Sequence, residues 1–268
     1  MAHLLIPTDL SERSMEAAVA GVALFGTEGN QFTLVYAYQA IALADPMVPG
    51  LIPDLHQVHV EGLERFEARL RAQVDLSGAQ VSRVAAYGPL SVLIDGIAQE
   101  TDVDLVVMSL TAEHGPVLFG TDASHVMSGA HVPVLGIPEG ITAPRIRRIL
   151  FADDRATIAP HTLDILAALA RMNHAEVIIA HVATGKSADQ LTDNSAVFAR
   201  TLNDIPYRTR VVEDDQVERA LLTLAAEEQA DMITLLHRHA GIWHSLFHAS
   251  VTRSIADHSP LPVLVLEQ

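Results

Sequence analysis

The strongest constraint on this chain is an internal repeat. Each half opens with a short apolar stretch that ends in aspartate, His3–Asp9 in the first half and Arg148–Asp154 in the second. Each half also closes on Pro-Val-Leu, at 133–135 and at 262–264. A repeat of this kind indicates two copies of one structural unit. We therefore predict two domains, residues 1–142 and residues 146–268.

Within each copy, short apolar runs alternate with segments of helical periodicity. The expected strands of the first copy are 3–7, 32–37, 80–86, 104–109 and 134–137. Those of the second are 149–152, 177–182, 207–212, 232–236 and 263–266. Such alternation predicts parallel sheets covered by helices on both faces. The fold class is therefore α/β, with two tandem doubly wound five-stranded sheets.

The second copy is expected to repeat the order of helices and strands of the first, with a deletion that mostly removes a proline-rich loop. In the first copy Ser11 is placed to cap a helix that stops at Gly26, and a proline-rich stretch over 40–53 is expected as a loop before a long amphipathic helix. Asp9 and Asp154 are 145 positions apart, whereas Asp104 and Asp231 are 127 apart. The second copy thus lacks 18 residues between its second and third strands. The expected helices of the second copy are 159–171, 187–202, 217–228 and 250–258.

Composition excludes several classes of function. Lysine and arginine total 17 against 33 acidic residues, a net charge of −16, which disfavours binding to nucleic acid and to anionic lipid. The chain has no cysteine, which rules out disulfides and thiolate chemistry. No apolar stretch approaches the length of a membrane helix, and no secretory signal is visible. We expect a cytoplasmic protein without nucleic-acid or membrane partners.

Several motifs together resemble the universal stress proteins. In the first half they are Leu-Ile-Pro-Thr-Asp-Leu-Ser at 5–11, Asp-Leu-Val-Val-Met at 104–108, Gly-Thr at 120–121 and the closing Pro-Val-Leu. The second half repeats the order, with Ala-Asp-Asp at 152–154. The resemblance covers both halves. It implies that the last strand of each copy pairs with its counterpart, so that the tandem chain forms an intramolecular pseudo-dimer.

The resemblance also implies an adenine-nucleotide site after the first and fourth strands. In the family, glycines let the backbone approach phosphates, and a final Gly-Ser or Gly-Thr opens a helix that holds the anion. In the first half Ser109 and Ala112 replace the first two glycines, and Asp122 lies where a phosphate would approach. The residues carried over for ATP in the first half are Pro7, Thr8, Asp9, Ala37, Met108, Gly120 and Thr121.

The second half departs further from the family loop. Leu236, His239 and Ala249 stand at its three glycine positions, so we expect no ATP there. The same loop is rich in histidine, which suits zinc, copper or nickel, although packing around Trp243 is the alternative. The candidate metal ligands are His237, His239, His244 and His248. With 14 histidines in all, sensitivity to pH near neutrality is a further expectation, without a named residue.

Catalytic motifs are scarce. The chain has no P-loop, nucleophile elbow or zinc-protease motif. The pair Asp153-Asp154 suits a Mg²⁺ ion, but such acids more often cap the following helix. We favour a regulatory or adaptor protein of the universal stress type, without catalysis and with an unidentified protein partner. The alternatives are an ATP-binding protein with slow ATPase activity and a divalent-metal sensor. A homodimer of tandem chains also stays open.

Overall fold

A computed structural model gives the fold of the chain, with the backbone alone for residues 51–55. It describes residues 2–38, 51–110, 126–127, 129, 131–159, 161–184, 192–238, 251–252, 254–256 and 259–268.

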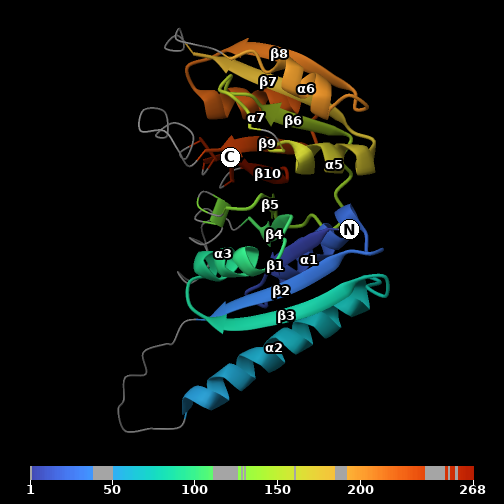
Figure 1. The fold of residues 1–268 in the computed structure, drawn as a ribbon, viewed down its shortest axis with the longest axis vertical. Helices are drawn as coiled ribbons and strands as arrows, with labels where there is room; N and C mark the ends of the chain where they lie inside the picture. Colours follow the sequence, from blue (N-terminus) through green and yellow to red (C-terminus); the bar gives the residue numbers. More distant parts are fainter. Residues whose placement is uncertain are drawn as a thin grey trace.

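The strands form a single sheet of ten (Figure 1). Those of the first half are β1 (His3–Pro7), β2 (Gln31–Tyr38), β3 (Gln80–Tyr87), β4 (Leu105–Ser109) and β5 (Val134–Ile137). Those of the second are β6 (Arg148–Ala152), β7 (Glu176–Ala183), β8 (Tyr207–Glu213), β9 (Met232–His237) and β10 (Val263–Glu267). The order across the sheet is β3-β2-β1-β4-β5-β10-β9-β6-β7-β8. Each half therefore contributes five neighbouring strands in the same doubly wound order, as predicted.

The two halves meet where the closing strands pair. β5 and β10 run antiparallel, with Leu135 opposite Leu264, whereas the other strand pairs are parallel. The two lie in the middle of the sheet, and β3 and β8 form its two edges (Figure 1). The predicted pairing of Val134–Ile137 with Val263–Leu266, and with it the pseudo-dimer, is confirmed.

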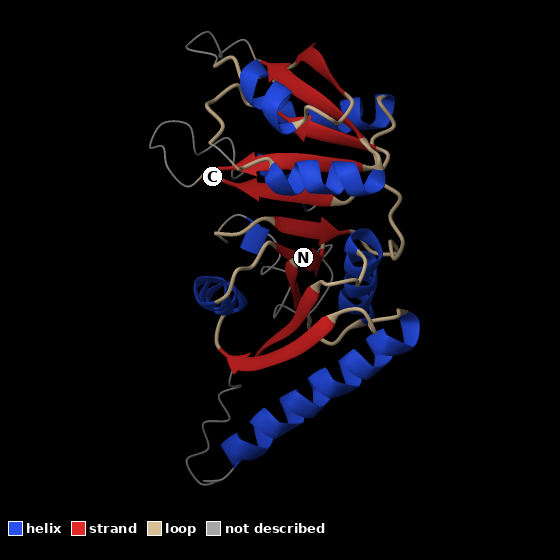
Figure 2. Ribbon diagram, turned by 45° about the vertical axis from the view of Figure 1, so that its right-hand side comes forward, coloured by secondary structure: helices blue, strands red, loops and turns tan. Residues whose placement is uncertain are grey.

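Helices cover both faces of the sheet (Figure 2). They are α1 (Glu12–Phe25), α2 (Leu51–Gln73), α3 (Leu90–Glu100), α5 (Asp164–Asn173), α6 (Ser195–Thr201) and α7 (Val217–Glu227). Side chains alternate between the faces along a strand, so Leu4 and Ile6 join a core with α1 and α2, while Leu5 joins a core with α3. Among the described residues, no helix combines the length and the apolarity needed to cross a bilayer.

Helix ends follow local chemistry where the sequence carries a signal. The Ser11 side chain accepts a hydrogen bond from Ser14 N and so caps α1, and Gly26 ends the helix at φ 68°. Both features were predicted. The expected loop over 40–53 is wrong for its last residues, because α2 already begins at Leu51. Pro53 is compatible with this start, since N–H groups in the first turn of a helix lack intrahelical partners.

The second half has shorter helices than expected. Its first helix was predicted from residue 159 but α5 begins at Asp164, after His161 adopts a positive φ of 71°. The next was predicted from 187, yet residues 192–194 are not helical and α6 begins at Ser195. The segment before residue 192 lies outside the described residues, as do parts of the predicted helices near 121–128 and 250–258.

One glycine allows close packing beside the seam between the halves. Gly136 lies on β5 between Met108 of β4 and Val263 of β10. A Cβ atom at this position would overlap Leu110 Cδ2 and would lie 2.8 Å from Met127 Cε. Such approaches are far below van der Waals contact. The strand therefore tolerates only glycine here unless Leu110 and Met127 repack.

We predict that Gly136→Ala lowers the free energy of unfolding by about 1–3 kcal/mol, the usual effect of overpacking a core. Gly96→Ala is the matched control, because Gly96 lies in α3 and a Cβ there meets nothing within 4 Å. The control should instead gain up to about 1 kcal/mol from helix propensity. Urea unfolding monitored by circular dichroism measures both. Equal stability of the two variants would contradict the packing described here.

A partly buried carboxyl group ends β10. Burial raises the pKa of Glu267 to about 8, although a backbone hydrogen bond from Gln268 acts in the opposite direction. In the unfolded chain the pKa of this group is near its ordinary value of 4.5. Between these values the folded chain keeps a proton that the unfolded chain has lost. The folded state therefore loses stability as pH rises through this window.

We predict that Glu267→Gln removes this dependence. The variant should match the native chain near pH 5 and exceed its stability by on the order of 1 kcal/mol near pH 8, after allowance for solvent screening. Glu213→Gln, at the exposed end of β8, is the control for loss of a carboxylate at a strand end. The measurement is thermal unfolding as a function of pH. A native chain and a Glu267→Gln variant with parallel curves would refute the assignment.

Candidate functional site

The candidate site lies where β1 and β6 end, and the chain turns in the same way at both places. Thr8 N donates to Val35 O at 2.9 Å, and Asp153 N donates to Ala180 O at 2.8 Å. Two residues further along each chain segment the backbone adopts a positive φ. It is 66° at Leu10 in the first half and 59° at the corresponding residue of the second. The two halves therefore present equivalent strand ends.

In the first half, side chains of the turn bind its own backbone. The Thr8 hydroxyl accepts from Leu10 N at 2.9 Å and lies 2.8 Å from the Ser14 hydroxyl. Asp9 Oδ1 accepts from Ser11 N at 3.0 Å. Thr8 is buried, whereas Asp9 is partly exposed. The turn thus fixes the direction of Asp9 and, among the hydrogen bonds of the turn, uses only its Oδ1 oxygen.

The second half repeats the turn with carboxylates at both positions. Asp153 Oδ1 accepts from Arg155 N, and Asp154 Oδ1 accepts from Ala156 N, each at 3.0 Å. The expectation that this pair caps the following helix is wrong, because α5 begins only at Asp164. The carboxylates instead hold the turn that precedes it. This is the role that Thr8 and Asp9 have in the first half.

The other residues carried over for a nucleotide lie on neighbouring strands. Pro7 ends β1, Ala37 is close to the end of β2, and Met108 is close to the end of β4. β2 and β4 flank β1 on either side, so these residues and Asp9 share one edge of the sheet. Ala37 and Met108 are buried in one apolar cluster. The remaining two, Gly120 and Thr121, lie outside the described residues.

A tyrosine adjoins Asp9 in the first half. Burial, and then the negative charge of Asp9, raise the pKa of the Tyr36 hydroxyl. Tyr36 therefore stays neutral on β2, the strand next to β1. His181 is the corresponding residue of the second half, and its Nδ1 donates to Asp153 O at 3.0 Å.

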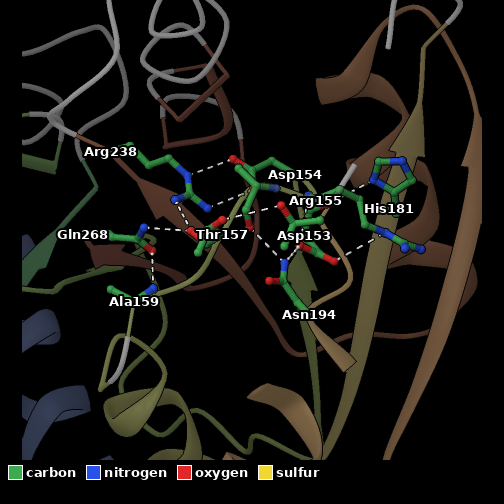
Figure 3. Close-up of polar contacts among 11 residues, drawn as sticks. Asp153, Asp154, Arg155, Thr157, Ala159, His181, Asn194, Arg238 and Gln268 are labelled. Atoms are coloured by element: carbon green, nitrogen blue, oxygen red, sulfur yellow. Dashed lines mark hydrogen bonds and ion pairs between the residues drawn. The ribbon is translucent and has the colours of Figure 1, made fainter. Parts of the chain in front are cut away.

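In the second half an arginine side chain binds the corresponding carboxylate, that of Asp154 (Figure 3). Arg238 follows β9 directly, and β9 lies beside β6. Its Nε lies 3.0 Å from Asp154 Oδ2 and its Nη2 lies 3.1 Å from Asp154 Oδ1. Its Nη1 donates to Thr157 O at 2.6 Å. Both oxygens of Asp154 are thus bound by one guanidinium group.

Asp153 lies deeper, below this ion pair. Its Oδ1 accepts a second hydrogen bond from Asn194 Nδ2 at 3.2 Å, and Arg155 Nε lies 3.6 Å from Oδ2. Burial raises the pKa of Asp153 and has the largest effect on it, while the hydrogen bonds from Arg155 N and Asn194 act in the opposite direction. Asp153 and Asp154 therefore serve the turn, Asn194 and Arg238, rather than a free Mg²⁺ site.

The histidine hypothesis concerns the segment after β9. His237 is the last residue of β9 and is buried. The other candidates, His239, His244 and His248, lie outside the described residues. Across the ranges that the structure describes, no group of three or more histidine, aspartate or glutamate side chains is arranged to hold a metal ion. The metal site stays a prediction.

The structure also brings together aromatic residues that the sequence patterns did not single out. The Tyr38 hydroxyl lies 2.8 Å from His56 Nδ1, and the Tyr38 and His59 rings stack with centroids 4.4 Å apart. Tyr87 meets Tyr38 edge-on at 6.2 Å. Burial, and then the neighbouring His56, lower the pKa of His59. A signal was present, since the buried stripe of α2 changes from Leu and Phe to His toward its N-terminus.

Arg238 was also missed as part of the site. It lies between two metal candidates in the sequence, and only the pairing of β9 with β6 places it against Asp154. The sequence did carry a signal. Arg238 is a charged residue directly after the buried strand β9, and β9 lies beside β6, the first strand of the second half.

Comparison with known proteins bears on the family and the fold of the chain. The model of the universal stress protein family matches residues 1–138 and 187–267. The fold is similar to that of a universal stress protein from Archaeoglobus fulgidus DSM 4304, at 20% identity and a TM-score of 0.75, covering 99% of this chain and 96% of that one. No curated protein matches in sequence.

Two further solved structures share the fold over nearly the whole chain. One is a functionally unknown protein from Pseudomonas aeruginosa PAO1, with a TM-score of 0.62 and 14% identity over 100% of this chain and 92% of that one. The other is the cytoplasmic domain of a prokaryotic cation chloride cotransporter, with a TM-score of 0.55 and 10% identity over 99% and 95%. At these identities the likeness concerns the fold alone. The family match covers most of the chain, in both halves, and the chain therefore belongs to the universal stress protein family.

Proposed function

We propose that this chain is a cytoplasmic, non-catalytic regulatory or adaptor protein that responds to an adenine nucleotide bound by its first half only. Family membership supports a role in a stress response. The finer assignment, to a regulator with one ligand site, rests on the difference between the two strand ends.

The observation that carries the proposal is the state of the two equivalent carboxylates. Asp154 is held on both oxygens by Arg238. Asp9 accepts one hydrogen bond, from Ser11 N, and within the described part of the chain no lysine, arginine or histidine lies within ion-pair distance of it. A carboxylate that is oriented by its own loop and carries no cation from the described residues can accept hydrogen bonds from a ligand's amino or hydroxyl groups.

The neighbouring groups favour binding over catalysis. A nucleophile needs a base within hydrogen-bond reach, but the Thr8 hydroxyl is bonded to Ser14 and Leu10 N, and it is buried beneath the turn. Tyr36 stays protonated because of burial and the charge of Asp9. Ala37 and Met108, on the strands on both sides of β1, are apolar and are buried in one cluster, so they offer no reactive group. Such a set can hold and orient a ligand without reacting with it.

We predict that ATP with Mg²⁺ binds with a stoichiometry of one per chain. Asp9→Asn should weaken it by about tenfold to a hundredfold, because a charge-assisted hydrogen bond is lost. Asparagine still accepts from Ser11 N, so the turn should persist. Asp75→Asn is the matched control, since Asp75 Oδ1 accepts from Ser77 N at 2.9 Å in the same kind of turn away from the site. Isothermal titration calorimetry measures all three proteins.

Two sites per chain, or an Asp9→Asn variant that binds like the Asp75→Asn control, would contradict the assignment of the site. If the native chain releases phosphate from ATP faster than ATP hydrolyses alone, and Asp9→Asn does not, the protein is an ATPase and not a non-catalytic regulator.

We also predict that Gly120→Val abolishes nucleotide binding. By resemblance, Gly120 is where the backbone approaches the phosphates, and a branched side chain would block that approach. Thermal melting with and without ATP gives the readout, with Gly96→Val as the control for a valine at an exposed glycine. An unchanged ATP-dependent shift in Gly120→Val would place the phosphates elsewhere.

A further inference from the structure

The two turns are similar enough for the occupants of one to be compared with those of the other. Each begins with the same backbone hydrogen bond to the neighbouring strand and passes through a positive φ, at Leu10 and at Arg155. In each, the carboxylate accepts from the backbone N–H two residues further along, through Asp9 and through Asp154. The turn therefore holds both carboxylates in the same way. Any other group that binds one of them, and not its counterpart, is supplied by residues outside the turn.

Arg238 reaches its carboxylate in the geometry that arginine uses for planar two-point recognition. Its Nε and Nη2 each contact one oxygen of Asp154, at 3.0 and 3.1 Å, and its Nη1 contacts the Thr157 carbonyl oxygen at 2.6 Å. The two side chains are 15% and 17% exposed. A two-pronged pair that is mostly removed from water is stronger and more specific than a surface ion pair.

A second clasp holds the same acceptor in place. Gln268 Nε2 donates to Thr157 O at 2.8 Å, and Gln268 Oε1 accepts from Ala159 N at 3.1 Å (Figure 3). The backbone N–H of Gln268 also donates to His237 O, next to Arg238. The end of β10, the end of β9 and the turn after β6 are thus tied together. Arg238 is placed by the fold and is not a freely moving surface side chain.

We propose that Arg238 is an intramolecular ligand of the strand-end site at Asp154, and that this residue decides which half of the chain is open to a bound molecule. The guanidinium takes the position on Asp154 that a ligand's hydrogen-bond donors would take on Asp9. This inference deepens the proposed function, on which its meaning for ligand choice rests, but the occupation of Asp154 can be tested without any nucleotide.

The chemistry of the acceptors defines what can replace the side chain. Among the described residues, the guanidinium contacts the two carboxylate oxygens of Asp154 and the carbonyl oxygen of Thr157, which are all acceptors. The site therefore selects a planar cation with several N–H groups, such as a guanidinium or an amidinium ion. A compact ammonium ion lacks the matching planar pair of donors. Truncation of Arg238 should create a receptor for small ions of the first class.

The test is chemical rescue of Arg238→Ala, followed by thermal melting. The variant should melt about 4 °C or more below the native chain, because one partner of a largely buried pair is lost. Methylguanidinium at millimolar concentration should restore at least half of this loss in a saturable manner. Methylammonium at the same ionic strength should not. The native chain and the double variant Asp154→Asn/Arg238→Ala should respond to neither ion.

A response of Arg238→Ala to methylguanidinium that is absent, or equal to that of the native chain, would overturn the proposal. If Arg238→Ala is unfolded, regain of its circular dichroism signal with methylguanidinium takes the place of the melting shift.

Arg238→Lys gives an independent measurement, since it keeps the charge but not the planar pair of donors. It should melt clearly below the native chain and show no rescue. If Arg238→Lys is as stable as the native chain, the positive charge alone suffices at this position, and the proposal is refuted. None of these readouts involves ATP, so a failure of nucleotide binding in the first half leaves them intact.

Discussion

The architecture depends on the antiparallel pairing of β5 with β10. Without it, the five-stranded groups of the two halves would end at β5 and at β10 in edges with unpaired backbone N–H and C=O groups. Pairing of Leu135 with Leu264 joins them into one sheet of ten strands. The seam also explains Gly136, because β5 must fit between two strands while Leu110 and Met127 pack over it. The corresponding residue of β10 is Val265, so the packing over the seam is not symmetric.

The same turn serves opposite purposes in the two halves. In both, side chains at the strand end satisfy backbone N–H groups of a strained loop, and this stabilises the loop without any ligand. What differs is the group outside the turn that neighbours Asp9 in the first half and Asp154 in the second. Asp9 lies beside the neutral hydroxyl of Tyr36, whereas Asp154 binds the guanidinium of Arg238. One inherited loop thus accommodates both an accessible acceptor and an internally neutralised one.

Much of the fold could be predicted from the sequence because its signals are local. Apolar runs gave the positions of the strands, Ser11 and Gly26 marked the ends of α1, and the repeat indicated which strands are equivalent. The start of α2 was misjudged because proline was read as a breaker, although it is tolerated in a first turn. The late start of α5 follows from a left-handed residue, His161, that no sequence pattern announces.

The candidate site was less predictable because its contacts are long-range. The structure places Pro7, Thr8, Asp9, Ala37 and Met108 at one sheet edge, as expected, since parallel strands bring their carboxyl ends together. The partner of Asp154 was not expected, because 84 residues separate it from Arg238 and only the β6–β9 pairing makes them neighbours. The stacking of His59 on Tyr38 has the same origin, in the docking of α2 on β2.

Covalent linkage of the two halves removes a restriction that a symmetric dimer cannot escape. In a homodimer every substitution appears in both subunits, so a residue that closes one cleft closes both. Here β5 and β10 belong to one chain, and their encounter does not depend on protein concentration. Each half is therefore free to change alone. The two halves of this sheet do differ. Only the second has the arginine that binds its strand-end aspartate among the described residues, and the segments that join the second and third strands differ by 18 residues.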